Sequence, residues 1–125
     1  MSEQKTVSFV GTCPARSGVT LVSKRIQTAF RLMGIAVRFA SGCNNLLRLY
    51  FYWSLDSSGV GSVAPGGVSL LRDYGQVDYV VGEGESKWLE HGLAVDAGGS
   101  YLKVYAENDD WYDHAVDVQM FLEID

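Results

Sequence analysis

The chain has 125 residues and a net charge of −5, and with 47% apolar and 20% charged residues its composition is that of an ordinary globular domain, not of a disordered or low-complexity chain. A chain of this length buries roughly two-thirds of the surface that its unfolded form exposes, so we expect a packed core in one domain over residues 1–125. The first residues, MSEQKTVSF, lack the apolar run of a secretory signal, and no stretch reaches the ~18 apolar residues of a membrane helix.

The N-terminal third contains one predicted strand and one ambiguous segment. We expect a strand near residues 5–11. Residues 19–33 also alternate as a strand, through Ile26, Thr28, Phe30 and Leu32, and this is the interpretation we favour. The same segment contains a stripe at helical spacing, which consists of Val22, Ile26, Ala29, Phe30 and Met33.

A helix over 19–33 would imply a different function. The preceding stretch, VSFVGTCPARSG, would then be a strand and a glycine-containing loop, the arrangement that binds phosphate at a helix N-terminus. The loop lacks both the GK[ST] ending and the GxGxxG pattern of such sites. A phosphate- or nucleotide-binding α/β domain is therefore the third-ranked function.

Two hairpins are predicted further along the chain. The stretch IAVRFA, the turn SGCNN and the stretch LLRLYFYWS predict the first, with Ile35, Val37 and Phe39 facing Leu47, Leu49, Phe51 and Trp53. The second joins YLKVYAE to the last strand, where Val116, Val118, Met120, Leu122 and Ile124 point to one face and the residues between them to the other. Leu102, Val104 and Ala106 form one face of its first strand, and Tyr101, Lys103, Tyr105 and Glu107 form the other.

Further strands near 77–82 and 87–96 bring the predicted total to about eight. Turn signals fall at short intervals throughout, for example DSSGVG, APGG and GEGES. The predicted fold is therefore all-β, an antiparallel two-sheet β-sandwich, with a jelly-roll among the arrangements that fit.

The acidic turn ENDDWYDH is a weak candidate metal site. Its carboxylates Asp109, Asp110 and Asp113 are ligands that hard cations prefer, but their spacing does not match a DxDxDG loop. We favour a solvated turn and expect neither a metal nor another cofactor. We expect Trp111 in this turn to fold back over the end of the sandwich; the alternative is an exposed aromatic that stacks on a sugar or anchors a partner.

No catalytic pattern accompanies the nucleophiles and bases of the chain. His91 and His114 are the only histidines, without HExxH, GxSxG or a histidine pair near them, so we predict a protein that is not an enzyme. No His or Cys lies at the spacing of a metal-ligand pair from Cys13 or Cys43. We expect two buried thiols, with a disulfide as the alternative.

Charge is distributed unevenly along the chain. Residues 1–52 contain seven basic residues and only Glu3 as an acid, whereas residues 53–125 carry a balance of −11. In the first predicted hairpin Arg38 would lie directly opposite Arg48, with Tyr50 and Tyr52 further along the same outward face. We expect these arginines to be covered by an acidic strand of the same chain, by another copy of the chain, or by a phosphate or acidic glycan.

These observations rank the functions and partners. First is a non-enzymatic structural subunit that self-associates into a homo-oligomer, as virion, shell or filament components do, with Arg38, Arg48, Tyr50, Tyr52 and Trp111 as candidate interface residues. The alternative is a carbohydrate-binding sandwich with Trp53, Trp88 or Trp111 as the sugar platform. An acidic pI near 4.9 disfavours nucleic acid, and we expect no membrane partner. We expect a location in the cytoplasm or in an assembly such as a virion.

Overall fold

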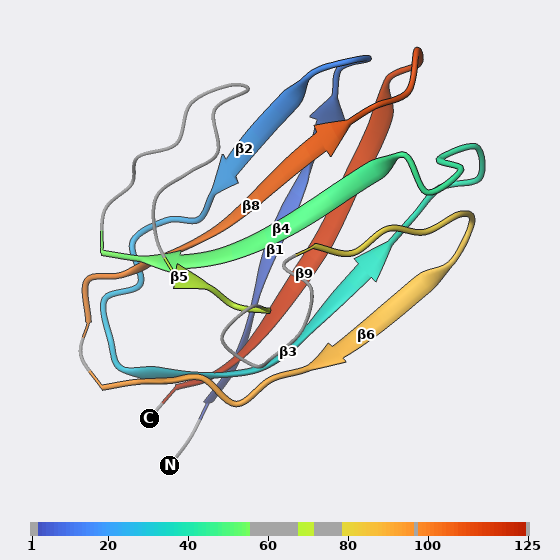
Figure 1. The fold of residues 1–125 in the computed structure, drawn as a ribbon. Coiled ribbons are helices and arrows are strands. Elements are labelled where there is room, and N and C mark those ends of the chain that lie inside the picture. Colours follow the sequence, from blue (N-terminus) through green and yellow to red (C-terminus); the bar gives the residue numbers. More distant parts are fainter. Residues whose placement is uncertain (1–2, 56–67, 72–78, 97, 125) are drawn as a thin grey trace.

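A computed structural model describes residues 3–55, 68–71, 79–96 and 98–124. These residues form strands and no helix, and the strands make two antiparallel sheets that pack face to face (Figure 1). The predicted all-β sandwich of about eight strands is therefore confirmed. No helix in the described residues is long and apolar enough to span a membrane.

The two sheets share the strands almost evenly. The first has the order β1–β9–β3–β6, with β7 also paired to β3: β1 (Glu3–Cys13), β9 (His114–Ile124), β3 (Phe30–Arg38), β6 (Ser86–Glu90) and β7 (Ala94–Val95). The second has the order β2–β8–β4–β5: β2 (Gly18–Val22), β8 (Tyr101–Asn108), β4 (Leu47–Ser54) and β5 (Val68–Ser69). Sheet order therefore interleaves strands from both ends of the chain.

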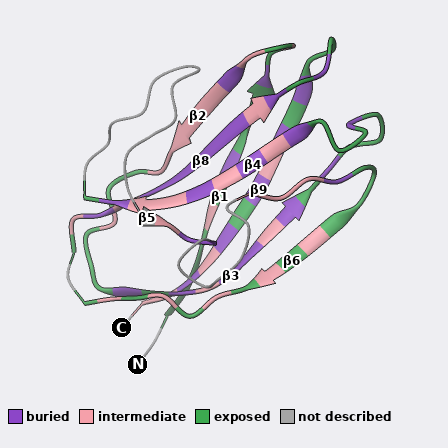
Figure 2. Ribbon diagram, viewed as in Figure 1, coloured by how far each residue is buried: buried purple, intermediate pink, exposed green. Residues whose placement is uncertain are grey.

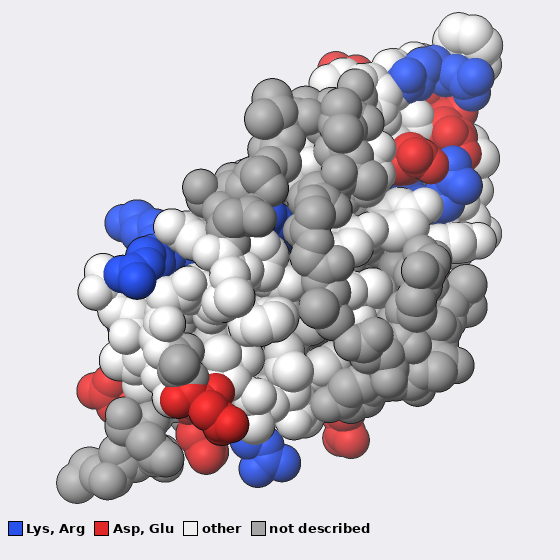
Figure 3. Space-filling view, turned by 60° about the vertical axis from the view of Figure 1, so that its left-hand side comes forward, with Lys and Arg blue, Asp and Glu red and all other residues white. Residues whose placement is uncertain are grey.

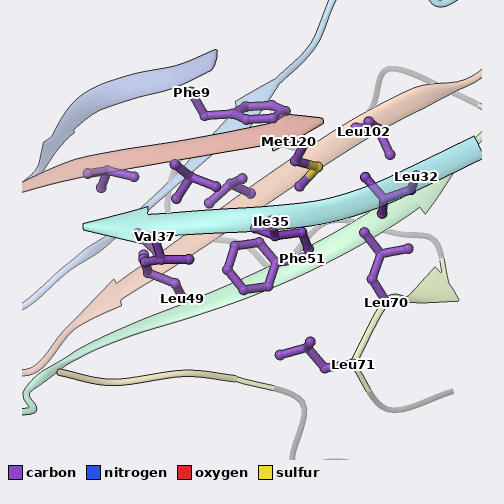
Figure 4. Close-up of a cluster of buried hydrophobic side chains, with 14 of the residues drawn as sticks. Phe9, Leu32, Ile35, Val37, Leu49, Phe51, Leu70, Leu71, Leu102 and Met120 are labelled. Carbon is purple, nitrogen blue, oxygen red and sulfur yellow. The ribbon is translucent and has the colours of Figure 1, made fainter. Parts of the chain in front are cut away.

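The core lies between the sheets, as the alternation predicts. In β9, Val116, Val118, Met120 and Leu122 are buried, whereas Ala115 and Gln119 are exposed (Figure 2). Side chains from β1, β3, β4, β8 and β9 converge on the same interior, with Leu70 and Leu71 closing one side (Figure 4). Removing such apolar area from water is the main stabilising contribution to a sandwich.

Both predicted hairpins are wrong, although their inward faces are right. β3 and β4 lie in opposite sheets, as do β8 and β9, so the turns between them cross the sandwich. The inward residues Ile35, Val37, Leu49 and Phe51 are all buried, but they meet across the core and not along a hydrogen-bonded pair. Alternation determines which face of a strand is apolar, and it carries no information about the hydrogen-bonded neighbour.

The ambiguous segment 19–33 is neither one strand nor a helix. It contains the end of β2, an irregular crossover over residues 23–29 and the start of β3. Ile26 in the crossover forms an isolated bridge with Ser100, which holds the chain as it passes from one sheet to the other. The third-ranked function, a phosphate-binding α/β domain, required a helix here and is wrong.

Two other predicted strands differ in detail. The segment 87–96 is interrupted at residues 91–93, so that β6 and β7 pair separately with the same edge of β3. The segment 77–82 lies partly outside the described residues, and within it Val80 bridges Leu49.

Strand β8 is buried on both faces, which alternation did not predict. Lys103 and Tyr105, on its outer face, are buried, as are the core residues Leu102 and Val104. Tyr105 packs beside Tyr50 of β4, with ring centroids 5.5 Å apart. The outer face of the second sheet is therefore aromatic and largely covered at its centre.

Candidate functional site at the loop end

The β1–β2, β3–β4 and β8–β9 connections meet at one end of the sandwich, together with residues 79–85, which precede β6 (Figure 1). Backbone hydrogen bonds tie them together: the Arg16 amide donates to the Asp110 carbonyl at 2.9 Å, and the Asp109 amide donates to the Leu46 carbonyl at 3.0 Å. The Glu83 carboxylate accepts from the Gly42 and Asn44 amides. We call the surface formed by Arg16, Glu107, Asp109, Trp111 and Tyr112 the loop-end site.

Asn108 organises the acidic turn from inside. Its side chain is 1% exposed, and its amide nitrogen donates to the carbonyls of Cys13, Pro14 and Tyr112. Its side-chain oxygen accepts from the Asp110 amide at 2.9 Å. An asparagine with all these bonds satisfied holds the turn in one conformation, so the exposed residues that follow are displayed on a defined backbone.

Arg48 is covered by its own chain. Its guanidinium forms ion pairs with Glu107 and, at 2.6 Å, with Asp109, and it lies over the Tyr79 ring at 5.9 Å. Arg48 faces Glu107 in the β4–β8 register, whereas Arg38 faces Asp117 in the β3–β9 register. The predicted opposition of Arg38 and Arg48 is therefore wrong, because the two arginines lie in different sheets.

The other predicted interface residues separate into two groups. Tyr50 and Tyr52 lie with Arg48 on the outer face of β4, and Tyr50 contacts Tyr79 at a centroid distance of 5.6 Å. Both tyrosines are half-buried. Trp111 lies in the β8–β9 turn, and Arg38 belongs to the opposite sheet. The five predicted interface residues therefore do not form one surface.

Trp111 projects from the loop end. Its side chain is 76% exposed and that of Tyr112 is 74% exposed, so the expectation that Trp111 folds back over the sandwich is wrong. The Arg16 guanidinium lies 4.9 Å from the Trp111 ring centroid and also donates to the Asp109 carbonyl at 2.7 Å. Basic and acidic side chains are interleaved at this end of the surface (Figure 3).

Arg16 is the residue of this site that sequence reasoning missed. It sits in the PARSG turn, 95 positions before Trp111, and no local pattern connects the two. Beside it is an open hollow of about 260 Å³, lined by Arg16, Tyr105, Glu107, Asn108 and Asp109 among others. The Tyr105 hydroxyl group packs closely against Gly18, and only glycine leaves room for it, because a Cβ at position 18 would lie 2.8 Å from the hydroxyl oxygen. The hollow offers both donors and acceptors, and its Arg16 also contacts the exposed ring of Trp111.

The three candidate metal ligands, Asp109, Asp110 and Asp113, each bind a different protein group. Asp109 pairs with Arg48, Asp110 accepts from His114 and from the Trp111 amide, and Asp113 accepts from the Ala15 amide at 2.8 Å. In the part of the chain that the structure describes, no group of three His, Cys, Asp or Glu side chains is placed to hold a metal ion.

Both histidines have structural partners. The His91 Nδ1 atom accepts from the Leu93 amide at 3.1 Å, so its Nε2 carries the proton and donates to the Leu70 carbonyl at 2.7 Å. His114 Nε2 donates to Asp110 at 2.8 Å in a largely buried contact. This hydrogen bond, more than any other cause, lowers the pKa of the Asp110 carboxyl.

Both cysteines are buried free thiols. Burial raises the pKa of Cys13 to about 11, and it also raises the pKa of Cys43. The Cys13 thiol donates weakly to the Ser17 and Ala106 carbonyls. A thiol in such an environment is a poor nucleophile.

Comparison with known proteins identifies the fold and no family. No family model matches the sequence, and no curated protein matches it. A chain in the structure of infectious bursal disease virus, Gt strain, is similar with a TM-score of 0.61 and 11% identity, over 98% of this chain and 31% of that one. This chain thus spans less than a third of that viral chain.

Two smaller proteins match over most of their own length. A chain of the cyanophage Pam1 capsid has a TM-score of 0.53 and 11% identity, over 99% of this chain and 85% of that one. A subunit of the Bacillus endospore appendages, described as disulfide-linked pili, has a TM-score of 0.51 and 14% identity, over 98% and 87%. These neighbours come from a virus, a phage capsid and a pilus, and at these identities the likeness establishes a shared fold.

Proposed function

We propose that the chain is a non-enzymatic structural subunit that self-associates, and that the edge of β1 is its assembly surface. The observation that carries this proposal is the free side of β1. This strand of 11 residues pairs with β9 on one side, and within the described residues no strand pairs with its other side. An unpaired strand edge presents a row of amides and carbonyls that a second chain can complete.

The composition of β1 favours pairing with another copy. Natural edge strands are often blocked by lysine, proline or a bulge. The charged residues of β1, Glu3 and Lys5, lie at its first end, whereas residues 6–13, TVSFVGTC, contain no charge and no proline. Two such strands can pair in antiparallel fashion without placing like charges opposite each other. Val10, 72% exposed, adds an apolar side chain beside that edge.

The order of the strands, the structural neighbours and the environments of the histidines and Cys13 support the same function. The orders 1–9–3–6 and 2–8–4–5 support a jelly-roll arrangement of the sandwich, an architecture common in viral capsids and lectins. The structural neighbours in a virus, a phage capsid and a pilus support incorporation into an assembly by analogy of fold. A non-enzymatic role is supported because His91, His114 and Cys13 are all engaged structurally.

The native mass tests this proposal. We expect light scattering after size exclusion to show an oligomer at high protein concentration, with little salt dependence because main-chain pairing carries the contact. Val10→Lys should shift the oligomer toward the monomer of 13.7 kDa. Leu55→Lys, at a residue 71% exposed and away from β1, is the matched control and should leave the mass unchanged. A wild-type monomer at every concentration would overturn the proposal.

A second candidate function is carbohydrate binding at the loop-end site. It is favoured by the exposed ring of Trp111, which contacts Arg16, a residue that lines the hollow with Asn108 and Asp109. Tyr112, the next residue, is also exposed. Aromatic faces that stack on a sugar, next to polar groups that bind its hydroxyls, suit such a ligand. A glycan array followed by titration of tryptophan fluorescence tests it: Trp111→Ala should abolish binding, and Trp88→Ala, which removes a tryptophan 53% exposed elsewhere, should not.

A further inference from the structure

A cleft opens at the end of the sandwich opposite the loop-end site. It lies between the first half of β1 and the crossover of residues 23–29, and its volume is about 510 Å³. The apolar part of its wall comes from Val7, Ile26 and Leu122, among others, which pack against the core. Small-molecule sites typically have volumes of ~300–1,000 Å³ and mostly apolar walls. The cleft therefore has the size and floor of a ligand site.

Lys5 lies at this cleft in a position where β1 should carry an apolar residue. The inward positions of β1 continue through Val7 and the buried Phe9, and Lys5 is paired in register with the buried Leu122. Opposite residues of an antiparallel pair point to the same face, so Lys5 starts from the core side of the sheet. Lys5 itself is exposed, like the other residues of β1 before Val7, so the inward row of the strand ends in a charged residue at the mouth of the cleft. Such breaks of the binary pattern are expected at functional sites.

Two further cations line the same cleft. Lys24 and Arg25 come from the crossover, and a group of basic side chains lies over it on the surface (Figure 3). Among the residues that the structure describes, no Asp or Glu lines the cleft. Within the described residues, Lys5, Lys24 and Arg25 form no ion pair, in contrast to Arg48 at the other end. Three unneutralised cations around an apolar floor, on a chain of net charge −5, form a local site for an anion.

We propose that this cleft binds a small anionic amphiphile, with its carboxylate or phosphate head on Lys5, Lys24 and Arg25. Its apolar tail would lie on Val7, Ile26 and Leu122. The cations attract and orient the head through charge-assisted hydrogen bonds, and burial of the tail contributes most of the affinity. The cleft borders the first half of β1 and shares residues 6–8 with the proposed edge contact, whereas it is separate from the loop-end site.

Calorimetric titration of the full chain with three probes tests the proposal. Decanoate, kept below its micelle concentration, should bind at one site, whereas decanol and inorganic phosphate should each bind at least about tenfold more weakly, a difference of ~1.4 kcal/mol. Equal binding of decanol would overturn the role of the cations. Equal binding of phosphate would overturn the role of the apolar floor.

A variant that restores the strand pattern separates ligand binding from a structural role for Lys5. Lys5→Leu should fold at least as well as the wild type, because it places an apolar residue on the core side, yet it should weaken decanoate binding about tenfold. Lys5→Arg should retain binding. Arg38→Gln, which removes a cation from the far end of β3, is the matched control and should bind as the wild type does. Unchanged decanoate binding by Lys5→Leu would overturn the assignment.

The remaining outcomes concern the source of the amphiphile and other occupants of the cleft. Preferential binding to vesicles of anionic phospholipid over free decanoate would overturn a free small-molecule ligand. If Lys5→Leu changed the native mass and left decanoate binding intact, the cleft would be a contact between copies. Because Val10→Lys tests assembly alone, failure of one proposal is distinguishable from failure of the other.

Discussion

The imidazole of His114 and the carboxylate of Asp110 meet 2.8 Å apart at the base of the β8–β9 turn. His114 is the first residue of β9, so this bond connects the end of the turn to the sheet that continues from it. Asp110 also accepts from the Trp111 amide at 2.7 Å, and Arg16 donates its amide to the Asp110 carbonyl. The position of the exposed Trp111 therefore depends on a buried polar pair.

This pair predicts a loss of stability in acid. The pKa of Asp110 is lowered in the folded state, chiefly by the bond from His114, so its contribution is complete above the ordinary carboxyl pKa of about 3.9 and is lost as the pH falls through the folded value. The unfolding midpoint of the wild type should decline below about pH 4, and that of Asp110→Asn should decline less steeply. Identical pH profiles in thermal unfolding would contradict this assignment.

Arg48 should act on stability and not on association. Arg48→Glu removes two partly exposed ion pairs and places a third carboxylate beside Glu107 and Asp109, so we expect a loss of roughly 1–2 kcal/mol in chemical denaturation. Arg25→Glu, which makes the same charge change where the described residues offer no ion pair, should cost less than about 0.5 kcal/mol. A change of native mass without a change of stability in Arg48→Glu would show that the arginine faces another copy.

Gly34 should be intolerant of alanine because of Trp88. The indole of Trp88 lies directly on Gly34, and an added Cβ would overlap the ring. We expect Gly34→Ala to cost about 1–3 kcal/mol of unfolding free energy, as overpacking does. In a Trp88→Ala background the same change should cost much less, which a double-mutant cycle measures. Equal costs in the two backgrounds would exclude the ring contact as the cause.

The two thiols should be protected in the native state. Burial raises the pKa of Cys13 to about 11 and also raises that of Cys43, and thiol reagents react with the thiolate. At pH 8 we expect modification with a colorimetric disulfide reagent to be at least about a hundredfold slower in native protein than in denaturant, with two thiols released on unfolding. Rapid release of one equivalent from native protein would show that a thiol is accessible.

The period-two pattern alone predicted the class of fold and most of the core. Because successive side chains of a strand point to opposite faces, the pattern identified the inward rows of β3, β4 and β9 before any partner was known. The same pattern did not identify Lys5. A polar residue at the end of a strand can be assigned to a face only when its partner is known, and the structure pairs Lys5 with Leu122 of β9.

Tertiary structure decided which strands pair and which charges meet. The turns at residues 39–46 and 109–113 look like hairpin connections, yet each crosses between sheets, because a hydrogen-bonded neighbour is selected by the packing of the whole core and not by the local turn. The ion pairs of Arg48 and the contact of Arg16 with Trp111 join residues far apart in the chain. The amino-acid sequence by itself determined an all-β sandwich with an acidic aromatic turn. The position of that turn, the free edge of β1 and the basic cleft were decided only by the tertiary structure, because side chains distant in sequence become neighbours only when the two sheets pack.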